Sequence, residues 1–200
     1  MQSEKGNSDA VIIQRVLEGR LEDYAFLVNK HAGALLHFVG RMIPIKEEAE
    51  EVVQDALLAA YQRLHDFDER KASFTVWLRR IAFNTATHHL RGLHPTFISM
   101  EESMDKTSAT TDAELDRILS EGGPDLKELL DRALEQLRPD ERTLLHLFYT
   151  DGRSLNEIAF ILGLKDEEHP ARAVSALTSR LHRIRKKLFV IINRLRNEYQ

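Results

Sequence analysis

The C-terminal segment 171–200 concentrates side chains that can bind a polyanion. It contains eight lysines and arginines and one glutamate. Such cations can neutralise phosphates, and arginine can also donate hydrogen bonds to a guanine edge. Apolar residues recur between them in steps of three and four, at Leu177, Leu181, Ile184, Leu188, Ile191 and Leu195. This periodicity predicts one amphipathic helix with a basic outer surface, which favours binding to duplex DNA.

Polar side chains off that apolar stripe are the candidates for contact with DNA. In the N-terminal half of the helix they would lie near base edges, and farther along they would suit contacts to phosphates. The candidates are Arg172, Ser175, Thr178, Ser179, Arg180, Arg183, Lys186 and Lys187.

A second basic segment spans residues 70–95, with five positive side chains and no negative one. Phe74, Trp77 and Phe83 lie among these cations. Aromatic rings in such a setting can stack on unpaired bases, at about 1–3 kcal/mol per base. Phe74 and Trp77 also fall on the apolar side of the predicted helix, so the pattern alone favours a role in the core.

The sequence offers little material for catalysis or metal binding. It has no cysteine, which excludes disulfides, thiol nucleophiles and cysteine-ligated metals, and which is typical of a reducing compartment. His88 and His89 are adjacent and point in different directions on a helix, and His94 lies past its end. No pair of histidines at ligand spacing has acidic neighbours. We therefore expect no enzymatic activity, no catalytic residue, no metal and no cofactor.

Charge varies strongly along the chain. The net charge of -4 would by itself argue against a nucleic-acid binder. Residues 47–69, however, carry eight negative side chains and one positive, and residues 96–137 carry eleven and four. Residues 138–200 carry twelve positive side chains and eight negative. The charge of each segment is therefore more informative than the total.

The elements that position these residues are predicted to be helices. Periodicity and caps indicate helices from Ser8 to Gly19, from Glu22 to Met42, from Ala49 to Leu64 and after the N-cap Ser73. The periodicity fails after Gly92, where a segment rich in Ser, Thr, Asp and Glu begins. We predict an all-α protein with two small helical domains, residues 8–92 and 125–200, joined by a flexible acidic linker, 93–124.

The second domain has the element order of a helix-turn-helix. Pro139 suits the first turn of one helix, after a helix over Asp125–Leu137. Ser154 and Glu157 have the spacing of a capping box, and Gly163 suits the end of the helix that they open. The basic helix then follows, in the position of a recognition helix.

Two stretches of the sequence resemble a known family. AEEVVQDALLAAYQRLHDF (49–67) and SFTVWLRRIAFNTATHHLR (73–91) resemble the sigma-two domain of extracytoplasmic-function (ECF) sigma factors of bacterial RNA polymerase. LRPDERTLLHLFYTDGRSLNEIAFILGL (137–164) and LTSRLHRIRKKL (177–188) resemble their sigma-four domain. A helix-turn-helix alone is a weak signal, whereas these two blocks in this order are a strong one.

The resemblance implies partners for the charged segments. The helix over residues 48–64 would bind core RNA polymerase through Glu51, Gln54, Asp55 and Leu58. The following loop and helix would bind the melted minus-ten strand of promoter DNA, whose capture must offset the cost of unstacking a base. The residues implied are Asp68, Arg70, Lys71, Ser73, Arg79, Arg80, Asn84, Thr87, His88 and Arg91. The basic C-terminal helix would bind the minus-thirty-five element as duplex, the acidic linker would enter channels of the polymerase, and an anti-sigma factor would be a further partner.

One segment departs from the family pattern. Family members join the last two helices by a tight turn, whereas KDEEHPARAVS (165–175) adds several residues before Leu177. Either the turn is longer or the recognition helix begins early, at Pro170.

The N-terminus lacks the apolar core of a signal peptide, so we expect a cytoplasmic protein without direct membrane insertion.

A different class of function also fits part of the chain. A helix-turn-helix transcription regulator that is not a polymerase subunit would explain the last block equally well. It would leave Ala49–Arg91 without an explanation. Such a regulator would bind promoter duplex without polymerase.

Overall fold

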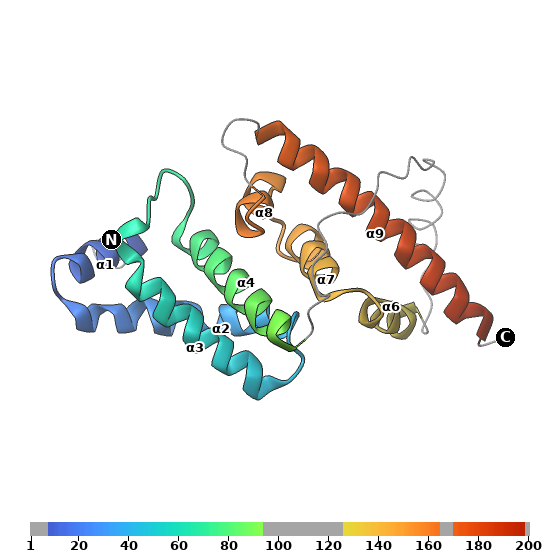
Figure 1. Cartoon of the computed structure of the whole chain (residues 1–200), viewed down its shortest axis with the longest axis horizontal. Coiled ribbons are helices and arrows are strands. Elements are labelled where there is room, and N and C mark those ends of the chain that lie inside the picture. The colour runs from blue at the N-terminus through green and yellow to red at the C-terminus, as the bar shows by residue number, and fades with distance from the viewer. Residues whose placement is uncertain (1–7, 94–125, 165–169, 199–200) are drawn as a thin grey trace, which may run out of the picture. The chain divides into compact units, whose positions relative to one another are not determined.

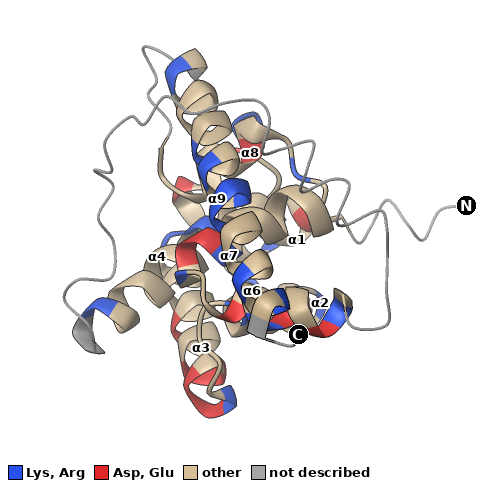
Figure 2. Ribbon diagram, turned by 90° about the vertical axis from the view of Figure 1, so that its right-hand side faces the viewer, with Lys and Arg blue, Asp and Glu red and all other residues tan. Residues whose placement is uncertain are grey.

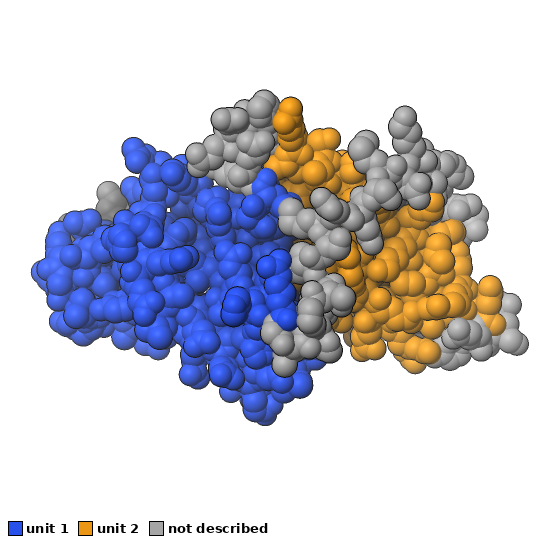
Figure 3. All heavy atoms as spheres, in the orientation of Figure 1, with its two compact units in different colours: residues 1–95, 156–165 blue, residues 96–155, 166–200 orange. Residues whose placement is uncertain are grey.

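The computed structural model describes residues 8–93, 126–164 and 170–198. The regular elements in these ranges are all helical (Figure 1), which confirms the predicted all-α fold. Nearly all of the predicted linker, 93–124, lies outside the described residues. Contacts divide the chain into two compact units, residues 1–95 with 156–165 and residues 96–155 with 166–200 (Figure 3). The domain boundaries given above stay a prediction.

The first unit contains α1 to α4 and, from the later part of the chain, most of α8. The bounds are α1 Asp9–Leu17, α2 Tyr24–Gly40, α3 Lys46–Gln62, α4 Phe74–Leu93 and α8 Leu155–Ile161. Helix α1 ends at Leu17, two residues before the predicted end at Gly19, which has a positive φ of 102°. The amides of Gly19 and Arg20 donate to the Val16 and Arg15 carbonyls, at 3.0 Å each. These two bonds satisfy carbonyls that the helix end leaves without partners.

The predicted second helix is shorter than expected at both ends. Residues Leu21–Asp23 form a 3-10 turn before α2, and α2 ends at Gly40 rather than at Met42. The sequence around Pro44 accounts for the early end, since the residue before a proline disfavours helical backbone. Met42 and Ile43, between the end of α2 and the start of α3, are both buried, so two apolar side chains anchor this connection.

Helix α3 packs against both α2 and α4. Its buried side is the stripe that periodicity predicts: Ala49, Val52, Val53, Ala56, Leu57 and Ala60. The alanines allow close approach of the neighbouring helices. Phe74 is buried, as the pattern favoured, whereas Trp77 is half-buried, with its ring 5.5 Å from that of Phe67; Phe83 is buried as well. Phe74 and Trp77 both contact Phe67 and therefore hold the start of α4 against the preceding loop.

The second unit is built around the long helix α9, Pro170–Glu198, with α6, Leu126–Glu135, and α7, Pro139–Leu145. The six apolar residues that predicted an amphipathic C-terminal helix are all buried. Pro139 occupies the first turn of α7 as expected. A π-helical turn, His146–Thr150, then extends this helix, and the amide of Asp151 donates to the carbonyl of His146 at 2.9 Å. Sequence periodicity did not predict this turn.

Helix α8 ends where the glycine predicts. Gly163 has a φ of 70°, and its amide and that of Leu164 donate to the carbonyls of Phe160 and Ala159, at 3.2 and 2.9 Å. The next described residue is Pro170, at which α9 begins. Of the two alternatives for residues 165–175, the early start of the helix is the one confirmed. None of the helices in the described ranges has the length and apolar character that crossing a bilayer requires.

Candidate nucleic-acid and protein interfaces

The outer side of α3 brings together the four residues implied in polymerase binding. Glu51, Gln54, Asp55 and Leu58 follow one another in steps of three, one and three residues and are all exposed. Leu58 leaves 56% of its surface exposed, although the helix has a well-filled apolar side of its own. The stripe thus offers two carboxylates, an amide and an apolar side chain to another molecule. Figure 2 shows the acidic residues of α3 grouped along the helix.

Tyr24 fixes the C-terminal half of α3 against α2. Its hydroxyl donates a hydrogen bond to the Leu57 carbonyl at 2.7 Å, and its ring lies 5.0 Å from that of Tyr61. Burial raises the pKa of Tyr24 to about 12, so the hydroxyl keeps its proton at neutral pH. The position of Leu58, one residue after Leu57, is therefore held by a specific contact.

The loop between α3 and α4 presents two cations around a fixed carboxylate. Asp68 accepts hydrogen bonds from the amide, Nε and Nη2 of Arg70, at 3.1, 2.9 and 2.9 Å. Hydrogen bonds from the side chain and amide of Arg70, with the charges of Arg70 and Lys71, lower the pKa of Asp68 to about 2. Arg70 nevertheless leaves 87% of its side chain exposed. Asp68 therefore orders the loop, and the two cations beside it face solvent.

Helix α4 divides the remaining minus-ten candidates into exposed and buried residues. Arg80, Asn84, His88 and Arg91 follow a helical line; Arg80 is half-buried and the other three are exposed. The Arg80 guanidinium lies 4.8 Å from the ring centre of Phe160, within the first unit. Ser73 is exposed, and its hydroxyl accepts a hydrogen bond from the Val76 amide, which makes it the predicted cap of α4.

Arg79 and Thr87 are buried, so their side chains are not presented to DNA in this structure. The Arg79 guanidinium lies 5.6 Å from the ring centre of Phe38 on α2. Both residues lie at the border of the apolar stripe of α4. At such a border, the residue type alone does not show whether the side chain is buried or faces solvent. An exposed DNA-binding surface on α4 therefore does not include Arg79 or Thr87.

Helix α9 also separates its candidates into two sets. One set faces outward: Arg172, Ser175, Thr178 and Ser179 are exposed, and Arg183 and Lys186 are half-buried. The Thr178 hydroxyl donates to the Val174 carbonyl at 3.0 Å, as threonine often does within a helix. The other set, Arg180 and Lys187, pairs with two carboxylates at the start of α7.

The pairs between α9 and α7 are close, and their carboxylates are buried, whereas Arg180 leaves 19% and Lys187 leaves 42% of its side chain exposed. The Lys187 ammonium lies 2.8 Å from Glu141 Oε2, and Arg180 Nη2 donates to Asp140 Oδ2. Burial of the Glu141 carboxyl would raise its pKa. The hydrogen bonds from Lys187 and from the Arg138 amide, with the charge of both residues, outweigh burial and lower it.

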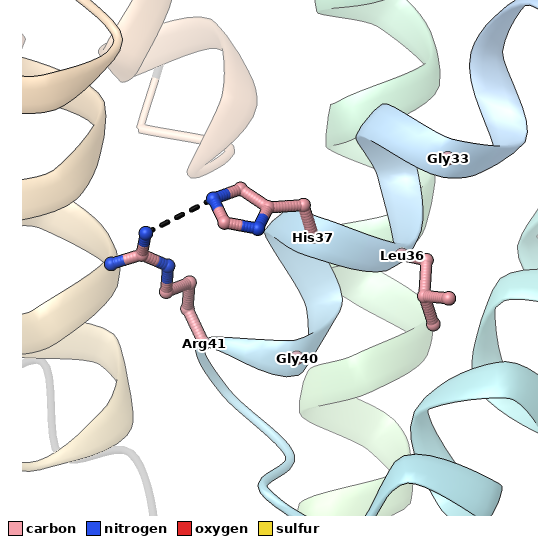
Figure 4. Close-up of a pocket in the computed structure, with 5 residues that line it drawn as sticks. All are labelled: Gly33, Leu36, His37, Gly40 and Arg41. Carbon is pink, nitrogen blue, oxygen red and sulfur yellow. Dashed lines mark hydrogen bonds between the residues drawn. The ribbon is translucent and has the colours of Figure 1, made fainter.

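The described residues contain no cluster of three or more histidine or acidic side chains that could hold a metal ion. A surface hollow on α2 is lined by Gly33, Leu36, His37, Gly40 and Arg41 (Figure 4). Arg41 Nη2 lies 3.0 Å from His37 Nε2. Apart from the adjoining backbone of α2, no atom lies within 4 Å of the position that a Cβ would take on either glycine, so this hollow is open.

Two family models match the chain. The model of sigma-70 region 2 matches residues 27–94, and that of sigma-70, region 4, matches residues 127–188. The first match contains α3 and α4, and the second contains α7, α8 and the N-terminal part of α9. The charged helices described above thus lie within the two matched regions.

Curated relatives match over most of both chains. The RNA polymerase sigma-H factor of Pseudomonas aeruginosa is 32% identical over 167 residues, covering 77% of this chain and 82% of the relative. The ECF RNA polymerase sigma-E factor of Escherichia coli K12 is 31% identical over 163 residues, covering 78% and 83%.

Solved structures share the fold. CnrH in complex with the cytosolic domain of CnrY has a TM-score of 0.57 at 24% identity, over 92% of this chain and 97% of that one. The sigma factor RpoE in complex with the anti-sigma factor NepR from Bartonella quintana has a TM-score of 0.56 at 21% identity. That match covers 86% of this chain and 98% of RpoE.

Regions 2 and 4 in this order define the class of sigma-70 factors, the subunits through which bacterial RNA polymerase recognises promoters. The alternative of a regulator that is not a polymerase subunit left Ala49–Arg91 unexplained, and the region 2 match accounts for that segment. Within the class, the chain belongs to the ECF sigma factors.

Proposed function

We propose that three separate surfaces of this sigma factor divide promoter recognition among them. The outer stripe of α3 binds core polymerase, the loop 65–72 with the outer line of α4 binds the melted minus-ten strand, and the outward side of α9 binds the minus-thirty-five duplex. The observation that carries this proposal is that each surface is reached by solvent, lies within a matched sigma-70 region, and has side chains whose charge suits the proposed contact.

The polymerase surface consists of Glu51, Gln54, Asp55 and Leu58. Leu58 provides apolar area that docking removes from water, and the acidic residues favour a basic partner surface. The α3 backbone behind them is supported by Ala56 and Ala60, which are fully buried. The surface therefore docks as one rigid helix face.

The minus-ten surface consists of cations and hydrogen-bonding side chains that solvent reaches. Arg70 and Lys71 lie in the loop, with Asp68 as the residue that orders it, and Ser73 fixes the turn into α4. Arg80, Asn84, His88 and Arg91 continue along α4. Positive charge along a single strand compensates phosphates, while a shaped loop holds an unstacked base.

The minus-thirty-five surface consists of Arg172, Ser175, Thr178, Ser179, Arg183 and Lys186. The residues near the start of α9 face outward where a recognition helix contacts base edges, and Lys186 lies farther along for a phosphate. Arg180 and Lys187 are left out, because they pair with carboxylates of α7.

The remaining features of this protein follow from its class. The chain acts as a non-catalytic subunit in the cytoplasm, where the polymerase works, and its activity is controlled by an anti-sigma factor. The support for the last point is the fold shared with RpoE, which was solved in complex with the anti-sigma factor NepR.

A set of single variants tests the division of labour. Asp55→Ala should weaken binding to core polymerase and leave the fold unchanged. Arg91→Ala should reduce open-complex formation without changing polymerase affinity, and Arg172→Ala should weaken binding of upstream duplex. Equal loss of all three properties in any one of these folded variants would contradict separate surfaces.

A further inference from the structure

The cations of α9 differ in whether the protein itself neutralises them. Arg180 and Lys187 are seven residues apart, so they lie on the same side of the helix. Each contacts an acidic residue at the start of α7: Arg180 contacts Asp140, and Lys187 contacts Glu141. Lys186 is adjacent to Lys187 in sequence but points about 100° away around the helix. It forms no hydrogen bond or ion pair within the described ranges.

The two carboxylates are buried, which makes their pairing with cations strongly favoured. The side chains of Asp140 and Glu141 are 6% and 7% exposed. Arg138 adds a third cation, with its Nε 3.5 Å from Asp140 Oδ1 and 3.7 Å from Glu141 Oε1. Its amide also donates to Glu141 Oε2 at 2.9 Å. A buried carboxylate that lost its cation would have to remain charged without a partner, which is costly.

These pairs bear on the choice between specific and non-specific binding of DNA. Sequence-independent affinity grows with the number of phosphates that a protein neutralises, whereas base contacts determine specificity. A cation that is held by a buried carboxylate does not add to the sequence-independent affinity. Two such cations on a recognition helix therefore lower non-specific binding without removing a base contact.

We infer that Asp140 and Glu141 are positioning residues that determine which cations of α9 reach DNA. Their ion pairs engage Arg180 and Lys187 and leave Arg172 and Lys186, which have no carboxylate partner among the described residues, as the cations that bind DNA. The inference rests on the proposed binding of the minus-thirty-five duplex by α9. Its consequence is a higher ratio of specific to non-specific affinity than the total charge of the helix would give.

Adjacent lysines provide a matched pair of variants for the test. The affinity of the full chain for a minus-thirty-five duplex and for a scrambled duplex is measured against salt concentration. Lys186→Gln should reduce the salt slope by about one, because one phosphate contact is lost. Lys187→Gln should leave the slope unchanged, although the same charge is removed from the next residue.

Variants of Glu141 test the same inference by removing the carboxylate instead of the lysine. Glu141→Gln releases Lys187, so the slope for the scrambled duplex should rise by about one and the ratio of specific to scrambled affinity should fall severalfold. The double variant Glu141→Gln with Lys187→Gln should return the slope to its native value. A role confined to stability would not produce this rise and return. The double variant also removes both charges together, so the test does not depend on the folding of Lys187→Gln alone.

Three results would overturn parts of this scheme. An equal fall in slope for Lys187→Gln and Lys186→Gln would mean that Lys187 contacts a phosphate, which would overturn the role of Glu141. No change in affinity or slope for Lys186→Gln and Arg172→Ala would instead overturn the proposed DNA surface of α9. A native slope in Glu141→Gln, with native folding, would also overturn the inference.

Discussion

Truncation of Leu58 provides a sharp test of the α3 surface. Complete burial of a leucine side chain is worth about 1.5–3 kcal/mol. Because Leu58 leaves 56% of its surface exposed, docking of a partner can still bury this part and gain about half of that free energy. Leu58→Ala retains part of this area, so we expect a loss of about 1 kcal/mol, which corresponds to about fivefold in Kd.

Leu17→Ala is the matched control for this variant. Leu17 is 50% exposed, lies in α1 and undergoes the same change in side chain. Neither substitution should destabilise its helix, since alanine is a better helix former than leucine. The measurement is competition between each variant and fluorescently labelled wild-type protein for core polymerase. Equal affinities of Leu58→Ala and Leu17→Ala would refute the assignment of Leu58 to the polymerase interface.

Three further predictions concern stability and DNA binding. The pKa of Glu141 in the folded state is below its ordinary value of 4.5. The contribution of Glu141 to stability is therefore present above pH 4.5 and is lost as the pH falls through the lowered pKa. Glu141→Gln should flatten this decline in the free energy of unfolding, as measured by urea titrations at a series of pH values. Tyr24→Phe removes the hydrogen bond to the Leu57 carbonyl and should reduce the free energy of unfolding by about 0.5–1.5 kcal/mol, as measured by chemical denaturation. Arg70→Ala should weaken binding of a minus-ten single strand severalfold and leave upstream duplex binding unchanged, as measured by fluorescence anisotropy.

Apolar periodicity predicted the helices because their buried sides are continuous. In α9 the stripe from Leu177 to Leu195 is uninterrupted, and every member of it is buried. The helix ends also depend on nearby residues. Ser73 caps the start of α4, and α8 ends at Gly163, where two backbone hydrogen bonds form. Each of these features depends on residues within a few positions of one another, so sequence alone was sufficient.

The site residues were harder to predict where their positions depend on tertiary contacts. Asp140 and Arg180 are forty residues apart in the chain, and no local pattern indicates that they pair. Arg79 has the residue type of a DNA contact but is buried against Phe38 on another helix. Apolar periodicity places such a residue at the edge of the buried side of its helix. Whether its side chain is buried then depends on the neighbouring helix.

The π-helical turn at His146–Thr150 had no signal in the apolar pattern. It inserts an extra residue into the helix and so shifts the side chains that follow. Its Tyr149 hydroxyl accepts a hydrogen bond from Arg185 Nη1 at 2.6 Å, which links the turn to α9. This contact, like those of Asp140 and Glu141, could not be inferred from the spacing of α9 alone.

Sequencing of transcript ends most directly tests whether this protein directs promoter recognition. Core polymerase is incubated with genomic DNA, with and without the protein, and the start sites are compared. We expect a set of start sites that appears only with the protein, that shares two spaced upstream elements, and that is lost when Gln54 and Asp55 are both replaced by alanine. The same start sites with and without the protein would contradict its role as a promoter-specificity subunit.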